Sequence, residues 1–438
     1  MNLFLNSLTA NMKKLRLLSL LITLLLCLPI FELLFRSLTI YICSTISTLI
    51  FLAIWALLHD YKFVPRAIFN LFIAGFLLSV LVTVFLTIVT PGRFPFSQQA
   101  FLFHFAVLFQ FLLVVSFFSS KSRALIWISL FSTITSRYLV LWSIVVIFIQ
   151  VFYLKNTIDN ALYQGGTSWF SLILLSASLS NINIKFSIRG LSFICSIASI
   201  LFASKRSTIL ASVFVLGLSL IKFMWSHKQF IAKFLSSYRI HRVAILSLIL
   251  TGFAFIVIVN YFPLLHLDKL TLTFNTIQDA NFHDDKSLQI ISGGRNIEIE
   301  AMLKSFQLSI TEFITISLTS GFGIGWRNTE FYSSSVHNSF FLLSMLGGFP
   351  FLLALLIQWI NLLLLFSRIS QSNILFSNHL NNDLYFSVLV AIGLGVDALF
   401  SANLIASFLC MALFFSTLPF SSSSQKEHKH LYPSHSKI

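Results

Sequence analysis

The chain has 438 residues, of which 57% are hydrophobic and only 10% charged, and its formal net charge is +15. Soluble globular chains hold about 45–50% apolar and about 25% charged residues, so this composition excludes a water-soluble fold. The basic residues stand in short clusters between apolar runs, a distribution that fits membrane topology and not a nucleic-acid footprint. We expect an all-α polytopic membrane protein with membrane lipids around it and no nucleic-acid partner.

Apolar runs long enough to cross a bilayer follow one another along the chain, since a spanning helix needs about 20 apolar residues. The sequence predicts about 12 transmembrane helices, at 16–35, 38–58, 67–90, 100–118, 138–154, 169–180, 188–203, 208–226, 243–262, 338–364, 383–399 and 402–420. Residues 124–136 fit either an interfacial segment or the first half of a long, kinked fifth span. In the second case Arg137 lies at or near the membrane surface. The predicted organisation is spans 1–9 within 1–262, a large loop at 263–337, spans 10–12 within 338–420, and a tail at 421–438.

The basic residues give an independent test of this topology. With the N-terminus in the cytoplasm, 18 of the 29 Lys and Arg residues fall in cytoplasmic segments and five in short segments on the other side. Five more lie in the long loop, which counts little for the positive-inside rule. We therefore expect both termini in the cytoplasm and the loop on the opposite face, which in a Gram-negative cell is the periplasmic face of the inner membrane.

The long loop concentrates the polar chemistry of the chain, because it holds eight of the fourteen acidic residues. Apolar residues inside it recur at spacings of 4, 3, 4 and 3, which predicts one face of an amphipathic helix: Ile299, Leu303, Phe306, Ile310 and Phe313. Such a helix lies flat on the outer membrane surface or caps the spans. The turn at Ser292-Gly-Gly294 places Arg295 at its start.

Three glycines follow that helix, in the run Gly321-Phe-Gly-Ile-Gly325. They are no dinucleotide fingerprint, since no strand–helix–strand unit surrounds them. We interpret them as a tight, close-packed turn that returns the chain to the membrane. His337 and Asn338 then stand at the mouth of the tenth span.

Basic and histidine side chains that share the outer face form the candidate site. Lys205 and Arg206 start a span there, either as surface anchors or as an anion site at a helix N-terminus. Two guanidiniums such as Arg206 and Arg295 can hold a diphosphate leaving group, and a histidine such as His337 can take a proton from an attacking hydroxyl. This set suits transfer from a lipid diphosphate better than glycoside hydrolysis, which uses two carboxylates.

At these residues the chain resembles the bacterial O-antigen polymerase and O-antigen ligase superfamily of membrane glycosyltransferases. The resemblance rests on four features in order: Ser204-Lys-Arg206-Ser207 at the start of a span, Gly294-Arg295, Gly321-x-Gly-x-Gly325, and Val336-His337-Asn338-Ser followed by a Leu/Phe run and Gly347-Gly348. It implies a GT-C-type bundle that moves a saccharide from undecaprenyl diphosphate to a sugar hydroxyl, without a metal or other cofactor. Whether the protein works alone or beside a chain-length regulator and a flippase stays open.

The resemblance also implies roles for particular residues. Arg206 and Arg295 would hold the donor diphosphate, and His337 would activate the acceptor. Arg327 and Lys205 are further candidate substrate contacts, with a plain surface charge as the other interpretation of Arg327. Asn338 is a candidate substrate contact whose residue type also suits the N-terminal cap of the tenth span.

Two acidic residues near the ends of the eleventh span, Asp383 and Asp397, are further candidates, since intramembrane acids are a functional hypothesis by default. Only Asp397 falls on the outer side, where it can line the site.

Three other functions compete with the polymerase. A ligase attaches finished glycan to lipid A-core and often carries a second His two residues before the catalytic one, where this chain has Ser335. A lipid-linked saccharide flippase predicts repeated halves and paired broken helices, which the sequence does not show. A structural or signalling membrane protein predicts that Arg206, Arg295 and His337 are each replaceable.

Overall fold

The structure is a computed structural model that describes residues 15–25, 50, 53–54, 67–89, 96–148, 164–180, 185–203, 205–226, 300, 302–304, 306–326, 338–371, 378–401 and 408–420. Over these residues the chain is almost entirely helical and forms no strand. One isolated antiparallel bridge, between Phe96 and Trp326, is the β-type pairing in this part of the chain. The predicted all-α class is confirmed for the described residues.

The helices have the following bounds: Leu15–Leu25, α3 (Ala67–Val89), α4 (Gln98–Phe117), α5 (Lys121–Arg137), α6 (Leu139–Phe148), α7 (Gln164–Ser180), α8 (Phe186–Ala203), α9 (Arg206–Ser226), α15 (Ile310–Thr319), α16 (Ser339–Gln371), α17 (Asn378–Ala398), α19 (Phe408–Phe415) and the 3₁₀ turn η5 (Leu418–Phe420). Ten of the twelve predicted spans coincide at least in part with one of these helices. The predicted span at 243–262 lies outside the described residues, and so do most of the predicted loop and the tail.

Four helical segments are long and apolar enough to cross a membrane: Ala67–Val89, Gln98–Phe117, Ser207–Trp225 and Ser339–Ser370. A fifth is obtained if α5 and α6 are one broken span. Shorter apolar helices occupy Leu15–Leu25, Trp169–Ser180, Ser187–Leu201 and Phe408–Phe420. These segments identify a membrane protein, and the predicted number of twelve spans is not confirmed.

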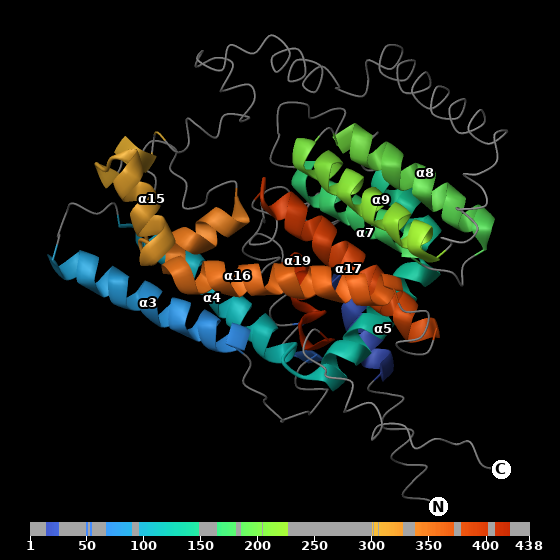
Figure 1. Ribbon diagram of the computed structural model, residues 1–438, viewed down its shortest axis with the longest axis horizontal. Coiled ribbons are helices and arrows are strands. Elements are labelled where there is room, and N and C mark those ends of the chain that lie inside the picture. Colours follow the sequence, from blue (N-terminus) through green and yellow to red (C-terminus); the bar gives the residue numbers. More distant parts are fainter. Residues whose placement is uncertain are drawn as a thin grey trace, which may run out of the picture.

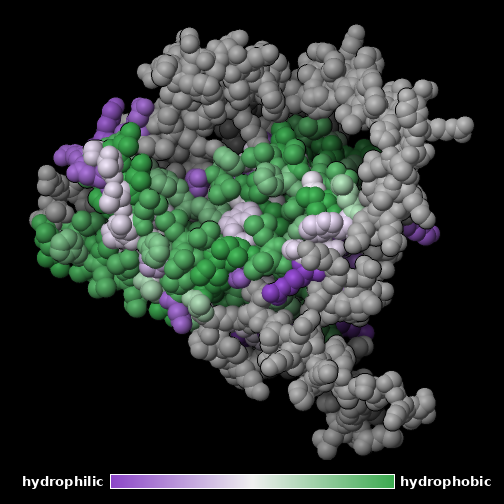
Figure 2. Space-filling model, in the orientation of Figure 1, coloured by the Kyte–Doolittle hydropathy of each residue, from purple (hydrophilic) through white to green (hydrophobic). Residues whose placement is uncertain are grey.

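α3 shows why the chain needs lipid as its solvent. One of its faces packs on α16 and α4, with Phe72 fully buried. The other face carries large exposed apolar side chains, among them Leu77, Leu81 and Ile88 at 55%, 66% and 71% exposure. Figure 2 shows this apolar surface running along the helix. A continuous apolar face of this kind marks a surface that contacts membrane or another protein, and on a helix of this length it fits lipid.

α17 is the centre of the described bundle. It packs against α7 and α9 on one side and against α16 and α19 on the other, as Figure 1 shows. Every residue from 384 to 398 is buried. The two acidic residues of the helix, Asp383 and Asp397, stand near its two ends. A helix with so apolar a middle carries its polar contacts to other helices at its ends.

A sharp bend separates α5 from α6 near residue 137, and the interfacial segment and the kinked span both stay predictions. The two helices meet at Tyr138 with an angle of 67° between them. Arg137 lies in the last turn of α5, directly before the bend. Residues 121–148 are therefore two helices with a sharp break, and Arg137 stands at the break.

The loop helix differs from the predicted one. Residues 302–304 and 306 are helical, but Gln307 has φ 54° and a new helix, α15, begins after Ser309. Phe306 and Phe313 are buried as predicted, whereas Ile310 is 61% exposed. The break restarts the helical phase, so residues on its two sides do not share one continuous face. The prediction of a single amphipathic helix that continues through Ile310 is wrong for this reason.

α16 is longer than the predicted span 338–364 and is broken near its start. Gly347 and Gly348 have non-helical backbone angles, and Gly348 has φ 61°. Pro350 stands two residues after Gly348, where the missing amide hydrogen of proline costs little at the start of a new helical segment. The break gives α16 a short first segment, 339–346, and a long second one.

Candidate functional site

The predicted site residues divide into those that the structure places and those that it does not. Arg295, Arg327 and His337 lie outside the described residues. Arg206 is the first residue of α9, and its backbone alone is described. Lys205 and Asn338 are described with their side chains. The contacts of Lys205 and Asn338 show where the start of α9 and the start of α16 lie.

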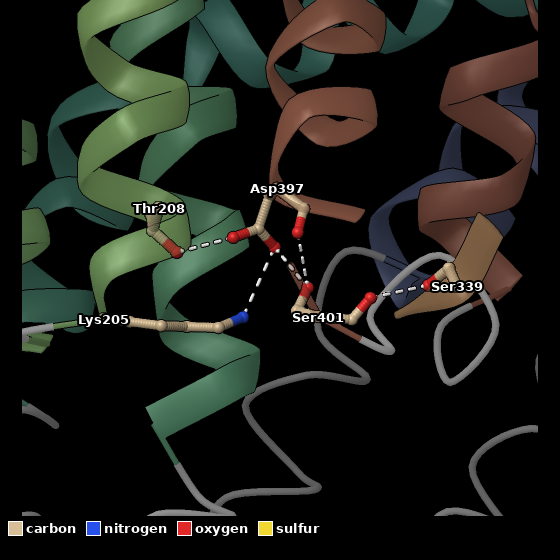
Figure 3. A network of polar contacts seen from close by, with 5 residues as sticks. All are labelled: Lys205, Thr208, Ser339, Asp397 and Ser401. Atoms are coloured by element: carbon tan, nitrogen blue, oxygen red, sulfur yellow. Dashed lines mark hydrogen bonds and ion pairs between the residues drawn. The ribbon is translucent and has the colours of Figure 1, made fainter. Parts of the chain in front are cut away.

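Lys205 forms an ion pair with Asp397. Its Nζ lies 3.3 Å from Oδ2 of Asp397, whose side chain is fully buried while that of Lys205 is 20% exposed. The hydroxyl of Thr208 donates to the other carboxylate oxygen at 3.0 Å. Lys205 precedes α9 and Thr208 belongs to its first turn, so the carboxylate at the end of α17 fixes the beginning of α9 (Figure 3).

Ser401 continues this network on the other side of Asp397. Its hydroxyl donates to Oδ2 of Asp397 at 2.9 Å and lies at the same distance from the Asp397 carbonyl oxygen. Its own carbonyl oxygen accepts hydrogen bonds from Ser339, from the hydroxyl at 2.8 Å and from the amide at 3.1 Å. Ser339 is the first residue of α16. The chain just after α17 thus fixes the beginning of α16 (Figure 3).

Asn338 is the N-terminal cap of α16. Its Oδ1 accepts a hydrogen bond from the amide of Phe341 at 2.9 Å, the geometry of a capping side chain. Its Nδ2 donates to the carbonyl oxygen of Leu399 at 2.6 Å. The expectation that residue 338 caps this helix is confirmed. Both ends of the amide already have a protein partner, so substrate contact by Asn338 stays a prediction.

The network brings together two parts of the chain that are far apart in sequence. Lys205 and Thr208 stand on either side of Arg206, and Asn338 and Ser339 directly follow His337. All four contact residues 397–401 at the end of α17. Of the predicted site residues, the structure thus brings Lys205 and Asn338 to one place, together with the backbone start of α9 at Arg206.

The electrostatics of this place are mixed. The N-terminus of α9 carries the positive end of its helix dipole, and Lys205 and Arg206 add two cations. Asp397 offsets one of these charges. The Lys205 ammonium has three N–H donors and gives one to Asp397, so it retains capacity for an anion on its exposed side.

The glycine run lies at a different place, across α3, α4 and the break in α16. Gly321, Gly323 and Gly325 all have positive φ, at 71°, 76° and 92°. A Cβ on Gly321 would stand 2.7 Å from the Met345 carbonyl oxygen, and one on Gly323 would stand 2.8 Å from that of Ser79. The predicted tight, close-packed turn is confirmed for these residues, because both the angles and the space require glycine.

Two polar residues that sequence reasoning did not identify hold this turn. The hydroxyl of Thr83 on α3 accepts from the amide of Ile324 at 2.7 Å. Nδ1 of His104 on α4 accepts from the amide of Gly325 at 3.1 Å. Both side chains stand within apolar helices, where they satisfy the amides of buried loop residues. The sequence signal that could have identified Thr83 and His104 is a polar residue inside an otherwise apolar run.

Thr208, Ser339 and Ser401 were missed for a different reason. Serine and threonine occur throughout the apolar runs of this chain, and several of the described ones bond to the carbonyl of the preceding turn. Nothing in the sequence separates the three that contact the Asp397 network.

In comparisons with known proteins, no family model, no curated protein and no solved structure matches the chain.

Proposed function

We propose that the protein is a membrane glycosyltransferase of the O-antigen polymerase kind. It transfers a saccharide from undecaprenyl diphosphate onto the sugar hydroxyl of a second lipid-linked O-unit. The observation that supports this most is the meeting of two chain segments at the end of α17. The neighbours of Arg206, Lys205 and Thr208, contact Asp397, and the neighbours of His337, Asn338 and Ser339, contact Leu399 and Ser401 of the same short segment.

The transfer needs an anion clamp and a base at one place. In the proposed reaction the acceptor hydroxyl oxygen attacks the anomeric carbon and the bond from that carbon to the phosphate oxygen breaks. The diphosphate leaves with the electron pair, and Arg206 and Arg295 hold its growing negative charge. His337 takes the proton of the attacking hydroxyl. Lys205 and Arg327 are the further candidate phosphate contacts.

The start of α9 suits the anion clamp on electrostatic grounds. A helix N-terminus with two adjacent basic residues attracts phosphate oxygens through its dipole and the two positive charges. Asp397 offsets part of that charge through its ion pair with Lys205. This supports placing the leaving group near α9 and the acceptor near the start of α16.

The proposed location is the inner membrane of a Gram-negative bacterium, with the site on the periplasmic face and both termini in the cytoplasm. The distribution of Lys and Arg supports this orientation, and the candidate spans support a membrane protein. The proposed bundle has about twelve spans in a GT-C-type arrangement, of which four or five are candidate spans in the described residues. A flippase that supplies the lipid-linked unit and a chain-length regulator are the proposed partners.

An O-antigen ligase is the second candidate, because both enzymes use the same donor and the same residue types. Ser335 stands where the ligase often has a further histidine, which favours the polymerase. A flippase of lipid-linked saccharide is the third candidate. It requires paired broken helices in two related halves, and the sequence shows no such repeat.

The test is complementation of a strain that lacks the protein, with lipopolysaccharide ladders resolved on gels. We expect Arg206→Ala, Arg295→Ala and His337→Ala each to abolish extension at protein levels equal to wild type. Arg368→Ala, in the last turn of α16, is the matched control and should leave the ladder intact. Normal ladders from Arg295→Ala and His337→Ala would refute the proposal.

The same gel separates the two enzymes. Loss of a polymerase leaves core bearing a single O-unit, because the ligase of the cell still attaches one unit. Loss of a ligase leaves bare core. A bare-core phenotype in the deletion strain would therefore replace the polymerase with the ligase.

A further inference from the structure

Asp397 is a fully buried carboxylate with partners from the start of α9 and from the chain just after α17. Lys205 lies 3.3 Å from its Oδ2 and Thr208 donates to its Oδ1 at 3.0 Å. The Ser401 hydroxyl donates to Oδ2 at 2.9 Å. A buried carboxylate is tolerated only when it is paired with a cation and its lone pairs accept hydrogen bonds. The arrangement around Asp397 meets both conditions.

Its contacts bracket Arg206. Lys205 is the residue before Arg206 and Thr208 is the second residue after it. Because both of them contact one carboxylate, the first turn of α9 is attached to the end of α17 at two points. The backbone of Arg206 is fixed with that turn, because it lies between the two contacts.

The same end of α17 fixes the beginning of α16. Ser401 accepts from Ser339 through its carbonyl oxygen, and the Leu399 carbonyl accepts from Asn338 at 2.6 Å. Ser401 is also the residue whose hydroxyl contacts Asp397. The carboxylate therefore stands between the first turn of α9 and the first turn of α16, as Figure 3 shows.

We propose that Asp397 is a positioning residue that sets the spacing between the first turn of α9, which begins at Arg206, and the first turn of α16. It acts through Lys205 and Thr208 on one side and through Ser401 and Ser339 on the other. As a role in glycosyl transfer this inference rests on the proposed function, whereas the spacing itself is a property of the fold. Loss of the charge lets the first turn of α9 move, and a displacement of about 1 Å in a reacting group can cost about 100-fold in rate.

The test uses Asp397→Asn, Asp397→Glu and a matched control on the same helix. Asp383→Asn makes the same chemical change 14 residues earlier in α17, about 21 Å away at 1.5 Å per residue. Asp383 accepts a hydrogen bond from Ser132 at 2.6 Å, so the control also removes a bonded carboxylate. It leaves the contacts of α9 and α16 with residues 397–401 in place.

The first readout is extension of the cell's own lipid-linked saccharide in the deletion strain, scored as ladder density at equal protein level. We expect Asp397→Asn to lower extension about 10- to 100-fold and Asp397→Glu, which keeps the charge, to restore most of it. Asp383→Asn should stay within about threefold of wild type, because residue 383 lies about 21 Å along α17 from the contacts at residues 397–401. Wild-type ladders from Asp397→Asn, or an equal loss from Asp383→Asn, would overturn the proposal.

The second readout does not depend on glycan chemistry. The Arg206→Cys variant is solubilised in detergent and the rate at which a maleimide labels position 206 is measured, with the parent chain as blank. We expect added Asp397→Asn to change that rate severalfold and added Asp383→Asn to leave it unchanged. An unchanged rate with Asp397→Asn would overturn the positioning role.

The two readouts separate this inference from the proposed function. If Arg206→Ala and His337→Ala leave the ladder normal while Asp397→Asn changes labelling at position 206, the glycosyl-transfer proposal fails and the spacing role stands. If the alanine variants abolish extension while Asp397→Asn alters neither readout, the function stands and the spacing role fails.

Discussion

The imidazole of His104 accepts, through Nδ1, a hydrogen bond of 3.1 Å from the amide of Gly325, which lies 221 residues later in the chain. Its ring also packs against that of Trp326, with 4.9 Å between the ring centroids. Nδ1 can accept only in the neutral tautomer that carries its proton on Nε2. A fully buried histidine of α4 thereby ties the glycine turn to the membrane-spanning part of the fold.

Removal of this acceptor should destabilise the protein. His104→Leu leaves the Gly325 amide buried without its partner, which costs about 1–3 kcal/mol. His104→Asn keeps a polar group near the position of Nδ1 and should cost less. The measurement is the free energy of unfolding of the purified protein in detergent, titrated with a denaturing surfactant. Equal stability of the leucine variant and wild type would show that the bond contributes nothing.

Gly348 should tolerate no side chain. It has φ 61°, and a Cβ there would overlap the Thr319 carbonyl oxygen and stand 2.6 Å from the Ser320 carbonyl carbon. The left-handed conformation alone costs an alanine about 1–2 kcal/mol, and the overlap adds to this. Gly217→Ala in α9 is the control, because a Cβ there meets nothing within 4 Å.

We expect Gly348→Ala to lower the thermal midpoint and the yield of monodisperse protein, while Gly217→Ala leaves both unchanged or slightly higher. The measurement is size-exclusion chromatography of the detergent-solubilised chain after heating in steps. Matching curves for the two variants would contradict the requirement for glycine at position 348.

The spanning helices and the glycine turn show how much of the fold could be predicted from the sequence. The length of the apolar runs predicted α3, α4, α9 and α16, because lipid imposes a minimum run of apolar residues on any spanning helix. The glycine turn was also predictable, since three alternating glycines have few uses outside a tight, close-packed turn. Both signals are local in the sequence.

The missed features depend on pairs of residues far apart in the chain. Nothing local connects His104 with Gly325, or Thr208 and Ser401 with Asp397. The break at Gln307 was missed because the apolar spacing continues across it, and only the start of a new helix at Ser309 resets the phase. Long-range contacts of buried polar groups are a property of the packed bundle.

The start of α15 should depend on pH. Ser309 and Glu312 form a capping box, in which the carboxylate accepts from the Ser309 hydroxyl at 2.7 Å and from its amide at 2.9 Å. These bonds favour the ionised form, the side-chain bond most, and lower the pKa of Glu312 below its ordinary value of 4.5. A lowered pKa means that the stabilisation is complete above the ordinary value and is lost as the pH falls through the lowered one.

We expect the amides at the start of α15 to lose protection from hydrogen exchange between pH 6 and about pH 3, after correction for the intrinsic rate. Ser309→Ala should reduce protection at pH 6 and flatten its pH dependence, because the bonds from the hydroxyl are gone. Protection that is the same at both ends of the pH range in the wild-type protein would contradict a role for the ionised box.

The last prediction concerns whether Lys205 acts alone or through Asp397. Lys205→Met leaves the buried carboxylate without its cation and should cost about 3 kcal/mol or more in the free energy of unfolding. Asp397→Asn also destabilises, because the ammonium loses its partner. The double variant Lys205→Met/Asp397→Asn removes both charges, and its cost should be smaller than the sum of the two single costs by about 0.5–3 kcal/mol.

The same single and double variants, measured for glycan extension, distinguish a structural role of Lys205 from direct binding of the donor diphosphate. If its main role is the ion pair, the double variant should extend glycan no worse than Asp397→Asn alone, since the positioning contact is already lost. If Lys205 binds the donor diphosphate independently, the two effects should multiply, because removing the phosphate contact then adds its own cost. Effects that multiply would identify Lys205 as a substrate contact. A double variant no worse than Asp397→Asn would instead show that the charge of Lys205 serves to keep Asp397 and the first turn of α9 in place.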